Sequence, residues 1–147
     1  MPSDAETKAH LEGIWAVNKH NSPIYAFLLS DVQFTTVSQG LVTARLQLTK
    51  NHINSKGGLH GSVSATLVDW VGGYAIASWD CRERMGVSVD IHVTYISSAG
   101  EGDWIEIEGR ANKVGKSLAF TTARIAKVVD GQAGPVIATA SHTKYFL

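Results

Sequence analysis

The run from residue 57 to residue 79, GGLHGSVSATLVDWVGGYAIASW, constrains the fold of this chain more than any other feature. Asp69 is its only charged residue. The run is too long for a strand, which usually ends within about 8 residues, and predicts a helix that begins near His60. A helix that is apolar on nearly every face must be buried on nearly every face. A curved sheet wrapped around the helix, with a second copy of the molecule beside it, can provide this burial in a small chain.

A transmembrane span is the alternative explanation of this run. It would place Asp69 near the centre of the bilayer, at a cost of roughly 2.5 to 3.5 kcal/mol. No basic cluster flanks either end of the run, and its Gly, Ser and Thr residues lower its hydrophobicity. We therefore expect the helix to be buried within a protein core.

Composition sets limits on the class of protein. With 147 residues, the chain is expected to form one domain over residues 1–147. Lys and Arg together number 13, as do Asp and Glu, so no net charge attracts nucleic acid or an anionic membrane. The single cysteine, Cys81, excludes an internal disulfide and a cysteine-rich metal site. The first residues lack the apolar stretch of a secretory signal, so a cytoplasmic protein is expected, with a mitochondrial one as the alternative.

The flanking segments predict a mainly β protein around the helix. In residues 87–95, apolar and polar residues alternate as in a strand with one buried face. The polar members of that alternation are Ser88, Asp90, His92 and Thr94. The other predicted elements are a helical segment in residues 1–22 capped by Asp4, a strand within about 27–37, and strands over 41–48, 104–112, 117–129 and 136–146. Two strands, a long buried helix and four antiparallel strands are the layout of the hotdog fold, an α+β architecture.

Short motifs around the helix identify a family. Residues 54–61, Asn-Ser-Lys-Gly-Gly-Leu-His-Gly, are followed by Asp69 eight residues after the last glycine. Together with Gly86-Val-Ser-Val-Asp90, residues 115–120 and His142-Thr-Lys144, this pattern resembles the acyl-CoA thioesterases of the phenylacetate-degradation group. The resemblance spans about residues 33–145. It implies hydrolysis of acyl-CoA to a free acid and coenzyme A, without a metal or redox cofactor.

The residues themselves also suit this chemistry. Thioester hydrolysis needs an activated water and stabilisation of the oxyanion that forms on the carbonyl. Gly61 at a helix N-terminus presents a backbone N–H, with the helix dipole behind it. Asp69 can act as a general base toward water or attack directly to form a mixed anhydride. The sequence does not separate these two routes.

The resemblance assigns further roles. It implies that Ser88 lies beside the attacking water and that Asn54 and His60 support the loop and the carbonyl. It implies that Lys113, Lys116 and His142 contact the nucleotide and phosphates of coenzyme A. The expected substrate-binding residues are Asp90, Tyr95, Lys113, Gly115, Lys116, Ser117 and His142.

The spacing of Gly61 and Asp69 predicts how the site is assembled. Eight residues of helix at a rise of 1.5 Å each separate them by about 12 Å. A reacting carbon must lie within roughly 3 Å of both the oxyanion donor and the nucleophile. Two antiparallel helices from paired subunits can satisfy this, so we expect a homodimer with shared sites. The resemblance implies a homotetramer.

Simpler roles are open for each of these residues. Asp69 is alternatively a buried structural acid, His60 a helix cap, Asn54 a turn residue and Ser88 a structural serine. Lys113, Lys116 and His142 are alternatively ordinary surface groups. At the level of function, the alternatives are a non-catalytic acyl-thioester binding protein and a hotdog hydratase or dehydratase. The last is disfavoured because we expect no second histidine near Asp69.

Overall fold

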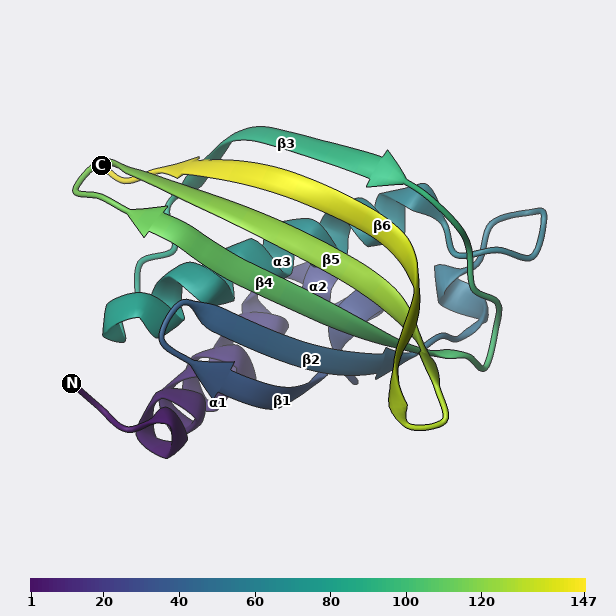
Figure 1. The fold of residues 1–147 in the computed structure, drawn as a ribbon, viewed down its shortest axis with the longest axis horizontal. Helices are drawn as coiled ribbons and strands as arrows, with labels where there is room; N and C mark the ends of the chain where they lie inside the picture. The colour runs from purple at the N-terminus through teal and green to yellow at the C-terminus, as the bar shows by residue number, and fades with distance from the viewer.

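Helix α3, Gly61–Asp80, lies behind a curved antiparallel sheet of six strands, which wraps around it (Figure 1). This computed structural model describes all residues 1–147. The strands run in the order β1-β2-β4-β5-β6-β3 across the sheet. Their bounds are β1 Gln33–Ser38, β2 Leu41–Gln47, β3 Val87–Tyr95, β4 Trp104–Val114, β5 Leu118–Val129 and β6 Gln132–Tyr145. The arrangement confirms the predicted hotdog fold and the helix start near His60.

Helix α3 is the centre of the core. Thirteen of its 20 residues are buried, as its apolar sequence predicts. Small residues let the sheet approach closely: a Cβ at Gly72 would lie 2.7 Å from Nδ1 of His142 on β6. A Cβ at Gly109 on β4 would lie 2.7 Å from the side chain of Val71. None of the three α-helices is both long and apolar enough to cross a bilayer.

The N-terminal segment differs from its prediction. Helix α1, Asp4–Asn21, is capped by Ser3 in a capping box with Glu6, so the prediction of Asp4 as the cap is wrong by one residue. A second helix, α2, covers Pro23–Leu29, where the sequence predicted an extended segment from about residue 27. Ser22 caps α2 and Pro23 takes its first position, where a missing N–H costs nothing. The Ser-Pro pair therefore starts a helix as well as ending one.

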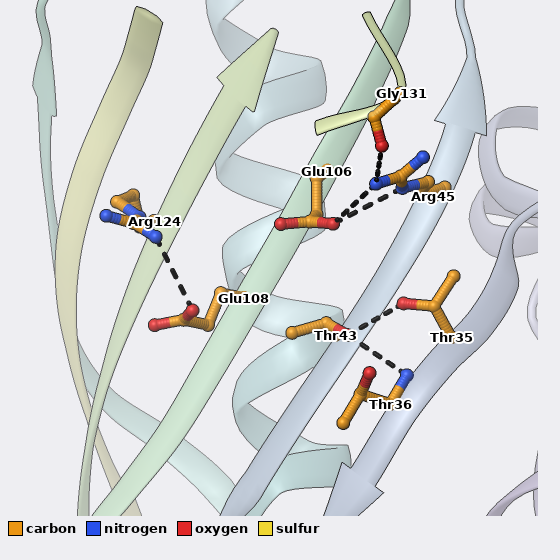
Figure 2. Close-up of polar contacts among 8 residues, drawn as sticks. All are labelled: Thr35, Thr36, Thr43, Arg45, Glu106, Glu108, Arg124 and Gly131. Carbon is orange, nitrogen blue, oxygen red and sulfur yellow. Dashed lines mark hydrogen bonds and ion pairs between the residues drawn. The ribbon is translucent and has the colours of Figure 1, made fainter. Parts of the chain in front are cut away.

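Strands β1, β2, β4 and β5 carry polar side chains on the face of the sheet that points away from α3 (Figure 2). Arg45 donates to Glu106 through Nε and Nη2, both at 3.2 Å, and Nη2 also donates to the Gly131 carbonyl. Arg124 lies 3.6 Å from Glu108 on the neighbouring strand. In Figure 2 these side chains lie in front of the strands, with α3 behind them. Residues in these strands therefore alternate between polar side chains on this outer face and buried side chains that face α3.

A β-bulge interrupts the alternation in β3. Ser88 pairs with Lys144 of β6, but the next pair is Asp90 with Thr143, so Val89 is an extra residue. Because a bulge shifts the side-chain phase by one, Ser88 and Ile91 share the inner face, while Asp90 lies on the outer face. The predicted alternation, which placed Ser88 and Asp90 on one side, is therefore wrong at this point.

Candidate active site

Asp69 is held by side chains from two other elements. It lies in the middle of α3 and is half-buried. The Tyr25 hydroxyl, from α2, donates a hydrogen bond to Oδ2. The Ser88 hydroxyl, from β3, donates to Oδ1 at 3.2 Å. The carboxylate therefore has one fixed donor on each oxygen, and Ser88 itself is exposed at the sheet edge.

Ser88 connects Asp69 to His142. Its Oγ lies 2.8 Å from His142 Nε2. The Ser88 hydroxyl has a single proton, which it donates to Asp69. In the contact with His142, Ser88 Oγ is therefore the acceptor and Nε2 carries the proton. Burial, together with the charge of Lys144, holds the pKa of His142 below its usual value of 6.5. The imidazole is therefore neutral at pH 7 and donates to Ser88, which donates to Asp69.

The position of His142 corrects two predictions. The side chain was expected near the coenzyme A phosphates or at the surface, but His142 is only 2% exposed and faces α3. No second histidine was expected near Asp69, yet His142 reaches it through Ser88. The buried Nδ1 has no hydrogen bond of good geometry, although the Val68 backbone lies close enough to favour the charged ring. The sequence pattern could not show this contact because it joins residues far apart in the chain.

Lys144 lies on the same inner face. It stands opposite Ser88 in the β3–β6 ladder and is 6% exposed. Burial lowers the pKa of Lys144, and the negative charge of Asp69 opposes this shift. The site therefore has a buried basic group that the sequence analysis did not place there.

The loop before α3 forms a compact turn. Asn54 Oδ1 accepts from the backbone N–H groups of Lys56 at 2.9 Å and Gly58 at 3.1 Å. His60 caps α3, because its Nδ1 accepts from the Ser62 N–H at 3.1 Å. Both side chains thus make the structural contacts given above as their simpler roles. These contacts shape the loop that leads into the start of α3.

Tyr95 explains why residue 61 is a glycine. Its hydroxyl donates to the Gly61 carbonyl at 2.8 Å, and its ring lies over the helix start. A Cβ at residue 61 would lie 3.3 Å from that ring. Gly61 and Asp69 are at positions 1 and 9 of α3, so about 12 Å of helix separates them. One subunit does not bring these two residues together.

The remaining predicted binding residues lie at the end of the sheet near the β4–β5 turn. Through the strand pairings, Lys113, Phe120, Thr143 and Asp90 form one row on the outer face. Lys116 and Ser117 are exposed in the turn, which Gly115 closes by donating to the Leu118 carbonyl at 2.8 Å. Lys113 and Asp90 therefore lie on the opposite side of the sheet from His142.

The isolated subunit has no main cavity at Asp69. One of the five main surface cavities, of about 580 Å³, lies between α1 and Glu83. None of the five is lined by Asp69, Ser88 or Gly61. No three His, Cys, Asp or Glu side chains lie together in an arrangement that could hold a metal ion. Ser88, which contacts Asp69, is exposed at the β3 edge of the sheet.

Tyr25 is the contact of Asp69 that sequence reasoning missed. It lies 44 residues before Asp69 in a helix that was not predicted. The available signal was Ser22-Pro23, a cap followed by a proline at the first helical position. That signal would have predicted α2, although not the contact of Tyr25 with Asp69.

Comparisons with known proteins find similar sequences and similar structures. Residues 56–133 match the sequence model of the thioesterase superfamily. Acyl-coenzyme A thioesterase 13 of Homo sapiens is 36% identical over 120 residues, 80% of this chain and 81% of the human protein. Thioesterase superfamily member 2 of zebra fish has a similar structure, with a TM-score of 0.80, 31% identity and 99% coverage of both chains. That of Mus musculus has a TM-score of 0.80 at 29% identity, covering 99% of this chain and 98% of the mouse chain.

Proposed function

The chain belongs to the thioesterase superfamily, and from this membership and the surroundings of Asp69 we propose that it hydrolyses acyl-CoA to a free acid and coenzyme A. The family match confirms the resemblance that the motif around Gly61 predicts. Relatives named acyl-coenzyme A thioesterase 13 support acyl-CoA as the substrate. The observation that carries the mechanism is the hydrogen bond between Asp69 and the exposed hydroxyl of Ser88.

In this mechanism Asp69 is the general base. A water held by Ser88 gives a proton to Asp69 Oδ1 while its oxygen bonds to the thioester carbon. The electron pair of the carbonyl moves to its oxygen, where a backbone N–H stabilises the charge. The C–S bond then breaks, and the proton passes from Asp69 to the departing sulfur. Each carboxylate oxygen of Asp69 already accepts a hydrogen bond, and this supports the general-base route over direct attack by Asp69.

The anhydride route is distinguished by isotope labelling. A single turnover in ¹⁸O-water places the label only in the product acid if Asp69 acts as a base. If Asp69 attacks and water then opens the anhydride at the aspartyl carbonyl, ¹⁸O enters the Asp69 carboxylate and appears in the peptide that contains residue 69.

The oxyanion donor comes from a second subunit in this proposal. Gly61 and Asp69 of one chain are about 12 Å apart, so the N–H is supplied by Gly61 of the partner subunit. Strand β3 supports a homodimer because it is a sheet edge with an unpaired side. Its exposed apolar side chains are Val87, Val89, Ile91 and Tyr95, followed by Ile96. The homotetramer implied by the resemblance stays a prediction.

A serine nucleophile is disfavoured by the order of contacts around Ser88. In a serine triad, histidine lies between the serine and the acid. Here Ser88 lies between His142 and Asp69, and no carboxylate contacts His142 Nδ1. A hydratase needs its histidine at the substrate, whereas both nitrogens of His142 are turned into the protein.

The proposed function is tested by incubating the protein with acyl-CoAs of varied chain length and aromatic character. Release of free thiol, followed with a thiol reagent, is the expected result, and Asp69→Asn should abolish most of it. Tight binding of the panel without thiol release would indicate a binding protein. Water addition to an enoyl-CoA without thiol release would indicate a hydratase.

A further inference from the structure

Helix α2 and Tyr25 lie outside residues 56–133, the span that matches the thioesterase superfamily. Tyr25 nevertheless makes a hydrogen bond to the carboxylate on which the proposed chemistry depends. We propose that Tyr25 is a positioning residue, which holds Asp69 Oδ2 so that Oδ1 faces Ser88 and the attacking water. This inference rests on the proposed function and adds α2 to the site.

The ring of Tyr25 is held in place by aromatic packing. It meets Trp15 of α1 edge-on, with ring centroids 5.9 Å apart. Trp15 packs in the same way on Trp70 of α3, with centroids 5.5 Å apart. Trp70 follows Asp69 directly in the chain, so the phenol and the carboxylate are positioned by one cluster. Edge-on aromatic pairs of this kind favour a defined orientation of the rings.

The C-terminal end of α2 is tied to the loop before α3. Nδ1 of His52 accepts from the Thr49 N–H at 2.9 Å, so Nε2 carries the proton and donates to the Leu28 carbonyl at 2.7 Å. The carbonyl of His52 accepts from the His60 N–H at 2.8 Å. Helix α2 therefore connects Asp69 at one side with the N-cap of α3 at the other.

Tyr25 is suited to donate and not to ionise. Burial, and the neighbouring charge of Asp69, raise its pKa far above the usual value of 10.0. A neutral phenol that donates to a carboxylate favours the ionised, proton-accepting form of that carboxylate. The other ionisable groups around Asp69 are His142 and Lys144 from β6, with Asp90 of β3 acting on His142 and Tyr74 of α3 acting on Tyr25. None of these hydrogen-bonds to Oδ2.

Tyr25→Phe tests the inference because it keeps the packed ring and removes only the hydroxyl. We expect kcat to fall roughly 10- to 100-fold, as for loss of a hydrogen bond to a charged group, with little change in KM. The acid limb of the pH–rate profile should move to higher pH, because the lost hydroxyl favoured the charged form of the base. Tyr74→Phe is the matched control, because Tyr74 lies in the same aromatic cluster and its hydroxyl contacts Asn18 instead.

A purely structural role for Tyr25 predicts a different result. It would lower the melting temperature of both variants and leave kcat and the acid limb of Tyr25→Phe at wild-type values, which overturns the inference. A direct titration of the Asp69 carboxylate by ¹³C NMR, assigned with Asp69→Asn, separates this outcome from failure of the proposed function. If the wild type releases no thiol, the proposed function fails. An Asp69 titration that is the same in wild type and Tyr25→Phe removes the positioning role whatever the reaction.

Discussion

Asp69 joins α2, α3 and β3 through hydrogen bonds to both of its carboxylate oxygens. Such contacts orient a base before substrate arrives, which saves reorganisation during the reaction. Asp69→Asn keeps the shape but removes the proton acceptor. We expect kcat to fall by about 10² to 10⁴, the usual contribution of a general base, while coenzyme A still binds.

Ser88→Ala should cost less than Asp69→Asn, since Ser88 orients the water and does not take its proton. Steady-state kinetics and calorimetric binding of coenzyme A measure both effects. A folded Asp69→Asn protein with near-wild-type kcat would remove Asp69 from the mechanism. A Ser88→Ala variant with no detectable turnover, and an acyl-enzyme in the wild type, would instead make Ser88 the nucleophile.

The buried imidazole of His142 predicts a dependence of stability on pH. Its pKa is lowered in the folded protein, so below pH 6.5 the unfolded chain takes up a proton that the folded protein does not. The free energy of unfolding should therefore fall as pH decreases through 6.5 toward the lower folded value. His142→Gln should reduce this decrease.

Melting temperatures between pH 7.5 and pH 5.5 measure this effect. His92→Gln is the control, because His92 is an exposed histidine on β3. The slope of melting temperature against pH should become shallower in His142→Gln and stay unchanged in His92→Gln. Equal slopes in all three proteins would show that burial of His142 does not govern the acid response.

Residue types and spacing predicted Asp69 and Gly61 as site residues, and the resemblance added Ser88 to them. The geometry around Asp69 could not be predicted in the same way. Tyr25 and His142 reach the site through the packing of α2 and β6 on α3, which no local pattern encodes. The structure shows the turn contact of Asn54 and the cap contact of His60, which are their simpler roles, and their roles at the carbonyl stay predictions.

Elements with strong periodicity were predicted well, and their interruptions were not. The long apolar run gave α3 its correct start, and the six strands appear in the predicted order. The bulge at Val89 escaped prediction because alternation continues on both sides of it and only the pairing with β6 reveals the extra residue. Helix α2 was missed because a seven-residue helix contains too few turns for a periodic signal.

The end of β4 and the β4–β5 turn carry the predicted phosphate contacts, Lys113 and Lys116. Both lysines are exposed, and no ion pair engages either of them. The double substitution to Ala should raise KM for acyl-CoA roughly 2- to 30-fold with little change in kcat, because two exposed charge contacts are lost.

The control for this turn is the double substitution of Lys8 and Lys19 to Ala on α1, which removes the same charge elsewhere. A short acyl thioester without the nucleotide should not distinguish the turn variant from wild type. The effect on acyl-CoA should also weaken with added salt. An equal rise in KM for acyl-CoA and for the short thioester would count against phosphate binding at this turn.

In the whole molecule, the proposed site residues form two separate clusters. Asp69, Tyr25, Ser88 and His142 form one cluster, and Asn54, His60 and Gly61 form another at the start of α3. In the proposed dimer, a second copy would dock on the open edge of β3 and its exposed apolar side chains. Two-fold symmetry would bring the cluster of each subunit to the other cluster of its partner, with two sites per dimer.

Complementation between inactive subunits tests this shared site most directly. Asn54→Ala and Asp69→Ala damage different clusters, so a mixed dimer has one site with both defects and one with neither. Random assortment of equal amounts should leave roughly a quarter of all sites intact, so co-expression should restore thiol release toward that fraction of wild type. Ser88→Ala with Asp69→Ala is the control, because both changes fall in one cluster and no mixed dimer has an intact site. If subunits exchange and the Asn54→Ala and Asp69→Ala mixture has only the average activity of its parents, the shared site is wrong and Asp69 serves a site within its own subunit.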